Sequence, residues 1–341
     1  MRVGGGRHRA GRQDIPLGVA VRDRNPLSAA PASLLVFGGI IAVQVGAGLA
    51  ARMFAQAGPA AVTGLRLWWA AAIMAVLGGR GLARTLRSVA DRRAWLDLGI
   101  GVAFGVVLGV MNFSIYQSFA RIPLGVAVTI EFLGPLAVAV ASSRRPLDVL
   151  WVGLAAAGVL LLTQGGARLA SGSRASQAGP LLGLSSTAAG IAFALVAAAC
   201  WAAYILLSRA TGRRFSGSSG LVLAMLVAAL VVTGPAVAST SPALSDPGVI
   251  AEGLAVGLLS SVIPYRVELE ALRRVPAGVF GIWMSLEPAV AALVGLVLLS
   301  EALIARQWLA IALVVIASAG AARSAASARQ SPDELPPPPA G

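Results

Sequence analysis

Ten apolar stretches dominate this sequence, each close to the length that a helix needs to cross a lipid bilayer. Such a helix takes about 20 predominantly apolar residues, and the stretches are 32–54, 59–79, 95–119, 123–142, 147–164, 187–208, 218–238, 248–269, 276–299 and 307–324. Composition agrees, because only 12% of the residues are charged, against about 25% in soluble domains. Since segments in lipid must satisfy their own backbone groups, the sequence predicts an all-α integral membrane protein with ten transmembrane helices.

Arginine supplies all of the basic charge, since the chain has 27 basic residues and no lysine. The arginines gather in the N-terminal segment and in alternate connecting segments, which is the asymmetry of the positive-inside rule. This predicts that both termini lie in the cytosol and that the chain is a multi-pass protein of the inner (cytoplasmic) membrane, with the lipid bilayer as a partner. The net charge of +13 then belongs to cytosolic loops, and we expect no nucleic-acid partner.

A proline-flanked segment occurs twice, and the repeat sets the expected symmetry. Residues 121–135 recur as 274–288, with Arg121 matched by Arg274 at an offset of 153 positions. The offset pairs the fourth apolar stretch with the ninth, so the chain divides into five plus five helices. An odd number of helices per half gives the halves opposite orientations. The sequence therefore predicts a 5+5 inverted repeat with both termini inside, an architecture typical of transporters.

The expected domain order follows from this division. The predicted segments are a disordered basic cytosolic tail (1–31), a first five-helix repeat (32–164), a Gly- and Ser-rich linker (165–186), a second five-helix repeat (187–324) and a disordered Pro-rich cytosolic tail (325–341).

Each copy of the repeated segment places one carboxylate in an apolar run. Glu131 lies about 12 Å along its helix from Pro123, and Glu287 about 16 Å from Pro276, so both are expected near the middle of the bilayer. A charge there costs about 2.5–3.5 kcal/mol on insertion scales, which favours a role in substrate binding or proton coupling. The alternative is structural, with Glu131 bonded to a neighbouring helix and Glu287 supporting a kink.

Arg66 is a third buried charge, expected about 10 Å from the membrane surface. It either binds a substrate carboxylate or locks a neighbouring carboxylate in an ion pair. Polar and aromatic residues at helical spacing predict the wall of a cavity for a small polar solute, although packing roles are equally open. These residues are Gln44, Asn112, Tyr116, Trp201, Tyr204 and Tyr265. Pro264 and Glu268 are expected to kink their helix and line its inner mouth.

Signatures of enzymes are absent from the sequence. The single histidine is His8, in the N-terminal tail, and without lysine there is no phosphate-binding loop. We therefore expect no catalysis, no cofactor and no metal, and transport driven by a solute or ion gradient.

These motifs resemble the EamA-type transporters of the drug/metabolite transporter superfamily, and most closely the bacterial threonine/homoserine exporters. The resemblance covers roughly 32–324 and is strongest at 109–116, 123–139, 142–148, 199–206, Pro264-Tyr265, 284–289 and Glu301. It implies proton-coupled export of a small-molecule substrate, an amino acid or related metabolite, by an antiporter with this ten-helix fold. Alternatives are a broader drug or metabolite exporter and a membrane sensor without transport.

Overall fold

The computed structural model describes residues 30–87, 92–142, 147–163, 181, 184–215, 218–239 and 242–328. Most of the predicted tails and of the predicted linker lies outside these ranges. Within them the regular elements are helices, apart from one isolated bridge between Leu181 and Leu184. The helices are α1 (Ala32–Arg87), α2 (Arg92–Phe119), α3 (Leu124–Glu131), α4 (Leu133–Ala141), α5 (Leu147–Thr163), α8 (Ser186–Gly212), α9 (Ser219–Ala238), η2 (Pro242–Ser245), α10 (Pro247–Gly257), η3 (Leu258–Val262), α11 (Ile263–Leu272), α12 (Ala277–Met284), α13 (Glu287–Leu299) and α14 (Ala305–Ala328).

Length and composition make this an integral membrane architecture. Among the described residues, eight segments are long and apolar enough to cross a membrane, and α5 adds a shorter apolar helix. The eight are Ala32–Ala83, Trp95–Phe119, Leu124–Ala141, Ser186–Gly212, Ser219–Ala238, Pro247–Leu272, Val279–Leu299 and Ala305–Ser327. Large apolar side chains remain exposed on their outer faces, for example Val76 at 86% and Val297 at 75%, as expected of surfaces that face lipid.

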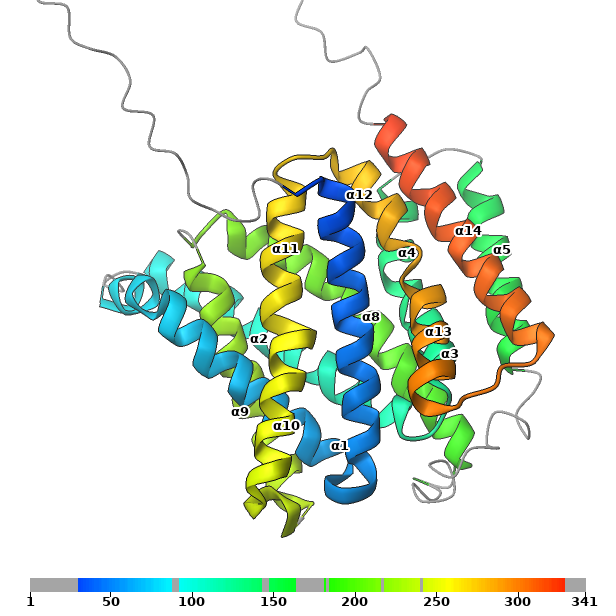
Figure 1. Ribbon diagram of the computed structural model, residues 1–341. Coiled ribbons are helices and arrows are strands. Elements are labelled where there is room, and N and C mark those ends of the chain that lie inside the picture. Colours follow the sequence, from blue (N-terminus) through cyan, green and yellow to red (C-terminus); the bar gives the residue numbers. More distant parts are fainter. Residues whose placement is uncertain are drawn as a thin grey trace, which may run out of the picture.

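Helix α1 contains a sharp turn at Gly58, which separates the predicted helices 32–54 and 59–79. Gly58 has φ 76° and ψ 158°, a conformation that residues with a Cβ atom rarely adopt. Pro59 follows directly and has no N–H to continue the hydrogen-bond ladder. The chain reverses at the foot of α1 and the second arm leaves at a steep angle (Figure 1).

The two copies of the repeated segment fold alike. Pro123 precedes α3 with φ −55° and ψ 143°, and Pro276 precedes α12 with φ −56° and ψ 141°. Each helix is 8 residues long, and each is followed by a break before α4 or α13 continues. Both glutamates lie at these breaks, because Glu131 is the last residue of α3 and Glu287 the first of α13.

The copies differ in their packing. Every residue of α3 is buried, and a Cβ atom on its Gly125 would lie only 2.6 Å from the Cα atom of Ala292 in α13. In α12, by contrast, Val279 is 37% exposed. The buried Leu124 N–H at the start of α3 donates to Glu301 Oε2 at 2.8 Å. The start of α3 is thus sealed against α13 and the segment after it.

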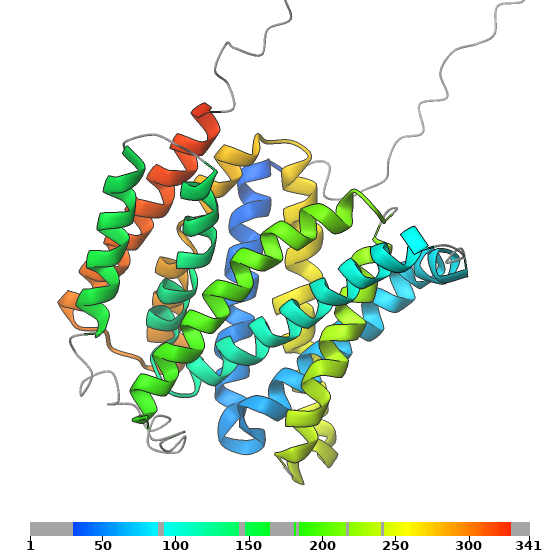
Figure 2. The same cartoon turned by 180° about the vertical axis from the view of Figure 1, so that it is seen from behind.

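The remaining helices enclose this centre. Helices α2 and α8 pack side by side and run obliquely across the back of the bundle (Figure 2). Helices α5 and α14 pack together at one edge in both views (Figures 1 and 2). The largest buried cluster joins α1, α2, α3 and α8 through side chains such as Phe54, Tyr116, Ile130 and Ala197.

Gly134 in α4 marks a contact where backbone meets backbone. A Cβ atom there would lie 2.2 Å from the carbonyl oxygen of Ala198 in α8, and neither helix backbone can yield as a flexible side chain does. We expect Gly134→Ala to destabilise the protein by about 1–3 kcal/mol, measured as a lower midpoint of thermal unfolding in detergent. Gly153→Ala in α5 is the matched control, because a Cβ atom there meets no atom within 4 Å. An equal response of the two variants would contradict the close helix contact.

Candidate substrate site

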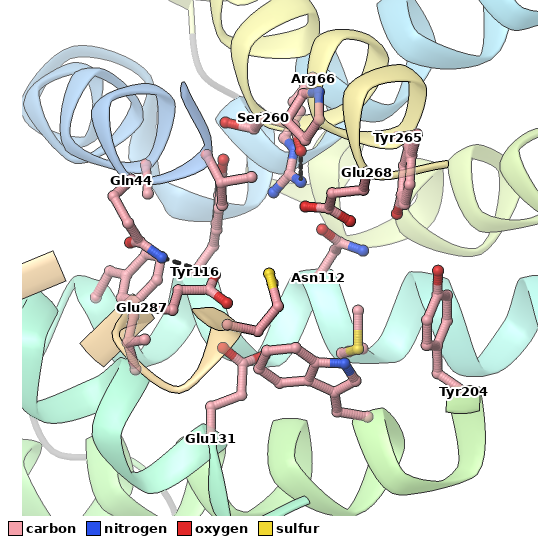
Figure 3. A pocket seen from close by; sticks show the side chains of 18 residues that line it. Gln44, Arg66, Asn112, Tyr116, Glu131, Tyr204, Ser260, Tyr265, Glu268 and Glu287 are labelled. Atoms are coloured by element: carbon pink, nitrogen blue, oxygen red, sulfur yellow. Dashed lines mark hydrogen bonds between the residues drawn. The ribbon is translucent and has the colours of Figure 1, made fainter. Parts of the chain in front are cut away.

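A cavity of about 160 Å³ lies at the centre of the bundle, where the broken helices meet α1, α2, α8 and the α10–α11 segment. Its wall includes all of the residues that the sequence analysis selected, namely Gln44, Arg66, Asn112, Tyr116, Glu131, Trp201, Tyr204, Tyr265 and Glu287. Figure 3 labels all of these except Trp201 and shows the labelled side chains around the cavity. The structure therefore brings together residues from positions more than 200 apart in the chain.

Glu131 faces this cavity without a protein partner. Its side chain is 8% exposed, and its carboxylate makes no hydrogen bond or ion pair with the residues that the structure describes. The position follows from the local fold, because α3 ends at Glu131 and Phe132 begins the break. A buried carboxylate without a hydrogen-bond donor is costly, so this group is available to a ligand or a proton.

Glu287 is held by one hydrogen bond and retains one free oxygen. Gln44 Nε2 in α1 donates to Glu287 Oε1 at 2.9 Å. Among the described residues, neither Gln44 Oε1 nor Glu287 Oε2 has a hydrogen-bond partner, although both atoms are buried. The pair therefore has one acceptor on each residue left to receive a donor from the cavity. The bond to Gln44 therefore leaves acceptor capacity of the Glu287 carboxylate unused among the described residues.

Arg66 reaches the cavity from the second arm of α1 and is anchored to η3. Its Nη2 donates to the carbonyl oxygen of Ser260 at 2.9 Å and its Nε to Ser261 Oγ at 3.3 Å. Segment η3 is a π-helical turn, and Pro264 has no N–H to donate to the Ser260 carbonyl four residues earlier. The guanidinium satisfies that carbonyl, and its carbon lies 5.2 Å from the centre of the Tyr116 ring.

The guanidinium also has donors to spare. Arginine carries five N–H donors, and Arg66 makes two recorded hydrogen bonds within the described chain. It forms no ion pair there with a carboxylate. The ion-pair lock that the sequence allowed is therefore absent from this conformation, and the anchoring to η3 orients the remaining donors.

The other wall residues form packed aromatic surfaces and local hydrogen bonds. Trp201 packs edge-on against Phe132, with ring centres 5.1 Å apart. Asn112 Nδ2 donates to the Leu108 carbonyl at 2.8 Å. Tyr116 is buried, and its hydroxyl has no hydrogen-bond partner within the described part of the chain. The hydroxyls of Tyr204 and Tyr265 point toward one another (Figure 3).

Among the wall residues that were not selected as site residues, three bear on the chemistry of the cavity. Ser260 anchors Arg66 through its backbone carbonyl, and Pro264 four residues later is the sequence signal for a carbonyl without its helical donor. Met284 is the repeat equivalent of Glu131, and its thioether replaces the carboxylate on the opposite half. Glu268 was placed at the inner mouth of its helix, and the structure places it in the cavity wall itself.

The charges around the cavity are unequal. Three carboxylates, Glu131, Glu268 and Glu287, line it together with one guanidinium, Arg66. In a site of low dielectric such an excess of negative charge requires a compensating cation or proton. The site is therefore suited to a solute that carries both an anionic and a cationic group.

Comparison with known proteins agrees with this arrangement. The model of the EamA-like transporter family matches residues 188–323. The chain is 38% identical over 278 residues to the threonine/homoserine exporter RhtA of Escherichia coli strain K12, covering 82% of this chain and 86% of that protein. The RhtA protein of Salmonella typhimurium strain LT2 is 36% identical over the same shares. The chain belongs to the EamA-like transporter family.

Membership of this family establishes the class of the protein. It is a multi-pass transport protein of the cell membrane and not an enzyme, as the sequence predicted. A protein of known crystal structure, 21% identical, superposes with a TM-score of 0.52 over 85% of this chain and 96% of its own. At that identity the superposition shows only that the two proteins share a fold.

Proposed function

We propose that the chain is a secondary active exporter of small neutral amino acids, with threonine and homoserine as its preferred substrates. The observation that carries the proposal is the central cavity, where one anchored guanidinium faces carboxylates that lack cationic partners. The two RhtA relatives carry threonine and homoserine in their names. The volume of about 160 Å³ also favours a small solute, since sites for drug-sized ligands measure about 300–1,000 Å³.

The charges suggest how an amino acid is held. Arg66 offers its free donors to the α-carboxylate, and charge-assisted hydrogen bonds from a guanidinium suit a planar carboxylate well. Glu131 and the free oxygen of Glu287 offer acceptors to the α-ammonium. Asn112, Tyr116, Trp201, Tyr204 and Tyr265 form the surrounding wall. This wall keeps water and lipid from the ion pairs between substrate and protein. Excluding water strengthens the electrostatic attraction within those pairs.

A ten-helix inverted repeat is the topology that we propose for this carrier. The turn at Gly58 divides α1 into two arms, each long enough for a span. With the arms counted separately and α5 included, the eight apolar segments become ten. The matching geometry of α3 and α12 supports the repeat, and the distribution of arginines supports cytosolic termini.

Alternating access is supported by the unequal packing of the two copies. An inverted repeat changes its open side when its halves exchange conformations, and here α3 is wholly buried whereas α12 is partly exposed. We propose that this conformation is closed at the start of α3. Proton coupling would then act through Glu131, whose carboxylate forms no hydrogen bond or ion pair with the described residues in this state.

Reconstituted transport tests the proposal. In liposomes with an inwardly directed proton gradient, the purified protein is expected to move threonine and homoserine against their gradients, whereas liposomes without protein do not. Dissipating the gradient with an ionophore should leave only downhill flux. Transport of large hydrophobic cations in place of amino acids would point to the broader drug exporter. Binding without any flux would contradict the carrier assignment.

A further inference from the structure

Glu268 is the carboxylate that the proposed binding mode does not use. It lies on α11, one turn after Tyr265, and lines the cavity. In the part of the chain that the structure describes, its carboxylate forms no hydrogen bond and no ion pair. Figure 3 shows the carboxylate directed into the cavity, on the same side as Arg66 and Tyr265. A ligand group is therefore the natural partner for it.

The stem of Glu268 lies beside α1. A Cβ atom on Gly39 would lie 3.5 Å from Glu268 Cγ and 3.6 Å from its Oε1, which are ordinary van der Waals distances. Packing of α11 against α1 therefore places the glutamate next to the α1 backbone, at the wall of the cavity.

The three carboxylates come from different elements and are not gathered into one cluster. Within the described chain no three acidic, histidine or cysteine side chains are grouped so that they could hold a metal ion. Glu131 and Glu287 come from the broken helices α3 and α13, whereas Glu268 comes from α11. An amino acid with its carboxylate on Arg66 and its ammonium toward Glu131 and Glu287 has only its side chain left to meet Glu268.

We propose that Glu268 determines substrate specificity by accepting a hydrogen bond from the side-chain hydroxyl of the amino acid, with Tyr204 and Tyr265 beside it. This inference rests on the proposed function. It extends that function by defining the substrate class as amino acids whose side chain ends in a hydrogen-bond donor. An apolar analogue leaves the carboxylate without a hydrogen-bond donor, and the cost of that unpaired group lowers the affinity for the analogue. Sites that hydrogen-bond a substrate hydroxyl reject analogues without it in this way.

Competition on the unmodified protein is the first test. Homoserine and α-aminobutyrate share a backbone, and only homoserine has the hydroxyl; threonine and valine are a similar pair. Homoserine should inhibit labelled threonine transport about 10- to 100-fold better than α-aminobutyrate, and threonine better than valine by a similar factor. This is the gain in affinity that one hydrogen bond to a charged group provides. Equal inhibition by both members of each pair overturns the proposal without any mutation.

Substitution is the second test. Glu268→Met keeps the volume and removes the acceptor, so the preference for threonine over valine should fall toward unity while valine transport is retained. Glu268→Gln keeps one acceptor and should give an intermediate ratio. Glu252→Gln, an exposed carboxylate on α10 outside this cavity, is the control and should keep the full preference.

The outcomes separate this inference from the function on which it rests. An unchanged threonine-to-valine ratio in Glu268→Met overturns the specificity role alone. Equal loss of both substrates in that variant, with the protein folded, also overturns it and indicates a part in coupling. If the wild-type protein transports none of these amino acids, the proposed function fails, and the inference fails with it.

Discussion

Replacement of Glu131 by glutamine is expected to abolish proton-driven threonine efflux and to leave the fold intact. The fold should survive because the Glu131 carboxylate has no hydrogen bond or ion pair among the described residues, so the amide leaves no protein group without its partner. Transport should fall because the cavity loses the charge that meets either the ammonium or the coupling proton. Loss of one partner of a buried charge pair costs about 3–5 kcal/mol, or at least about a hundredfold in rate or affinity.

Two assays on the same variant distinguish the roles left open for Glu131. Threonine–threonine exchange across liposomes requires binding and movement but no proton gradient. A coupling role predicts that exchange persists in Glu131→Gln while uphill efflux is lost; an amine-binding role predicts that both are lost. Glu252→Gln serves again as the control. Uphill efflux at the wild-type rate would remove Glu131 from the site.

Replacement of Arg66 by lysine is expected to reduce transport by about a hundredfold. Lysine keeps the charge but is a compact point charge, and it does not reproduce the planar arrangement of guanidinium donors. Arg66 bonds to Ser260 and Ser261 while it offers further donors to the cavity, and an ammonium group cannot occupy both places. The Michaelis constant for threonine should rise, measured as initial rates in liposomes.

Stability separates the two functions of Arg66. Arg66→Met removes the donor to the Ser260 carbonyl, which Pro264 leaves without its usual partner, and an unsatisfied buried acceptor costs about 1–3 kcal/mol. Its unfolding midpoint in detergent should therefore fall below that of Arg66→Lys. Arg213→Lys, exposed after α8, should match the wild type in both measurements. Full transport by Arg66→Lys would refute the carboxylate-binding role.

Much of the helix pattern was accessible from the sequence because its causes are local. Pro123 and Pro276 start equivalent helices for a local reason, since proline lacks the N–H that would extend a preceding helix. The offset of 153 positions also matched α3 with α12, and it identified position 284 as the repeat equivalent of Glu131. Less accessible was the turn at Gly58, whose positive φ is visible only in the folded backbone.

The contents of the cavity could be predicted in part. Buried charge in an apolar run is expensive wherever it lies, and this selected Glu131, Glu287 and Arg66 before any packing was known. The partners of these groups could not be predicted, because they come from distant segments. Gln44 meets Glu287 across 243 positions and Arg66 meets Ser260 across 194, and no local pattern encodes such pairs.

The sequence by itself determined the membrane class, the apolar helices, the duplicated segment and the family of this protein, because length, hydrophobicity and proline spacing are properties of the chain alone. The tertiary structure decided which side chains share one cavity and which of them are left without partners. Glu268 illustrates the difference. In the sequence it is one of several charges at a helix end, whereas the packing of α11 against α1 places it in the wall of the cavity. A hydrogen bond depends on positions in space, and only the packing of the helices sets those positions.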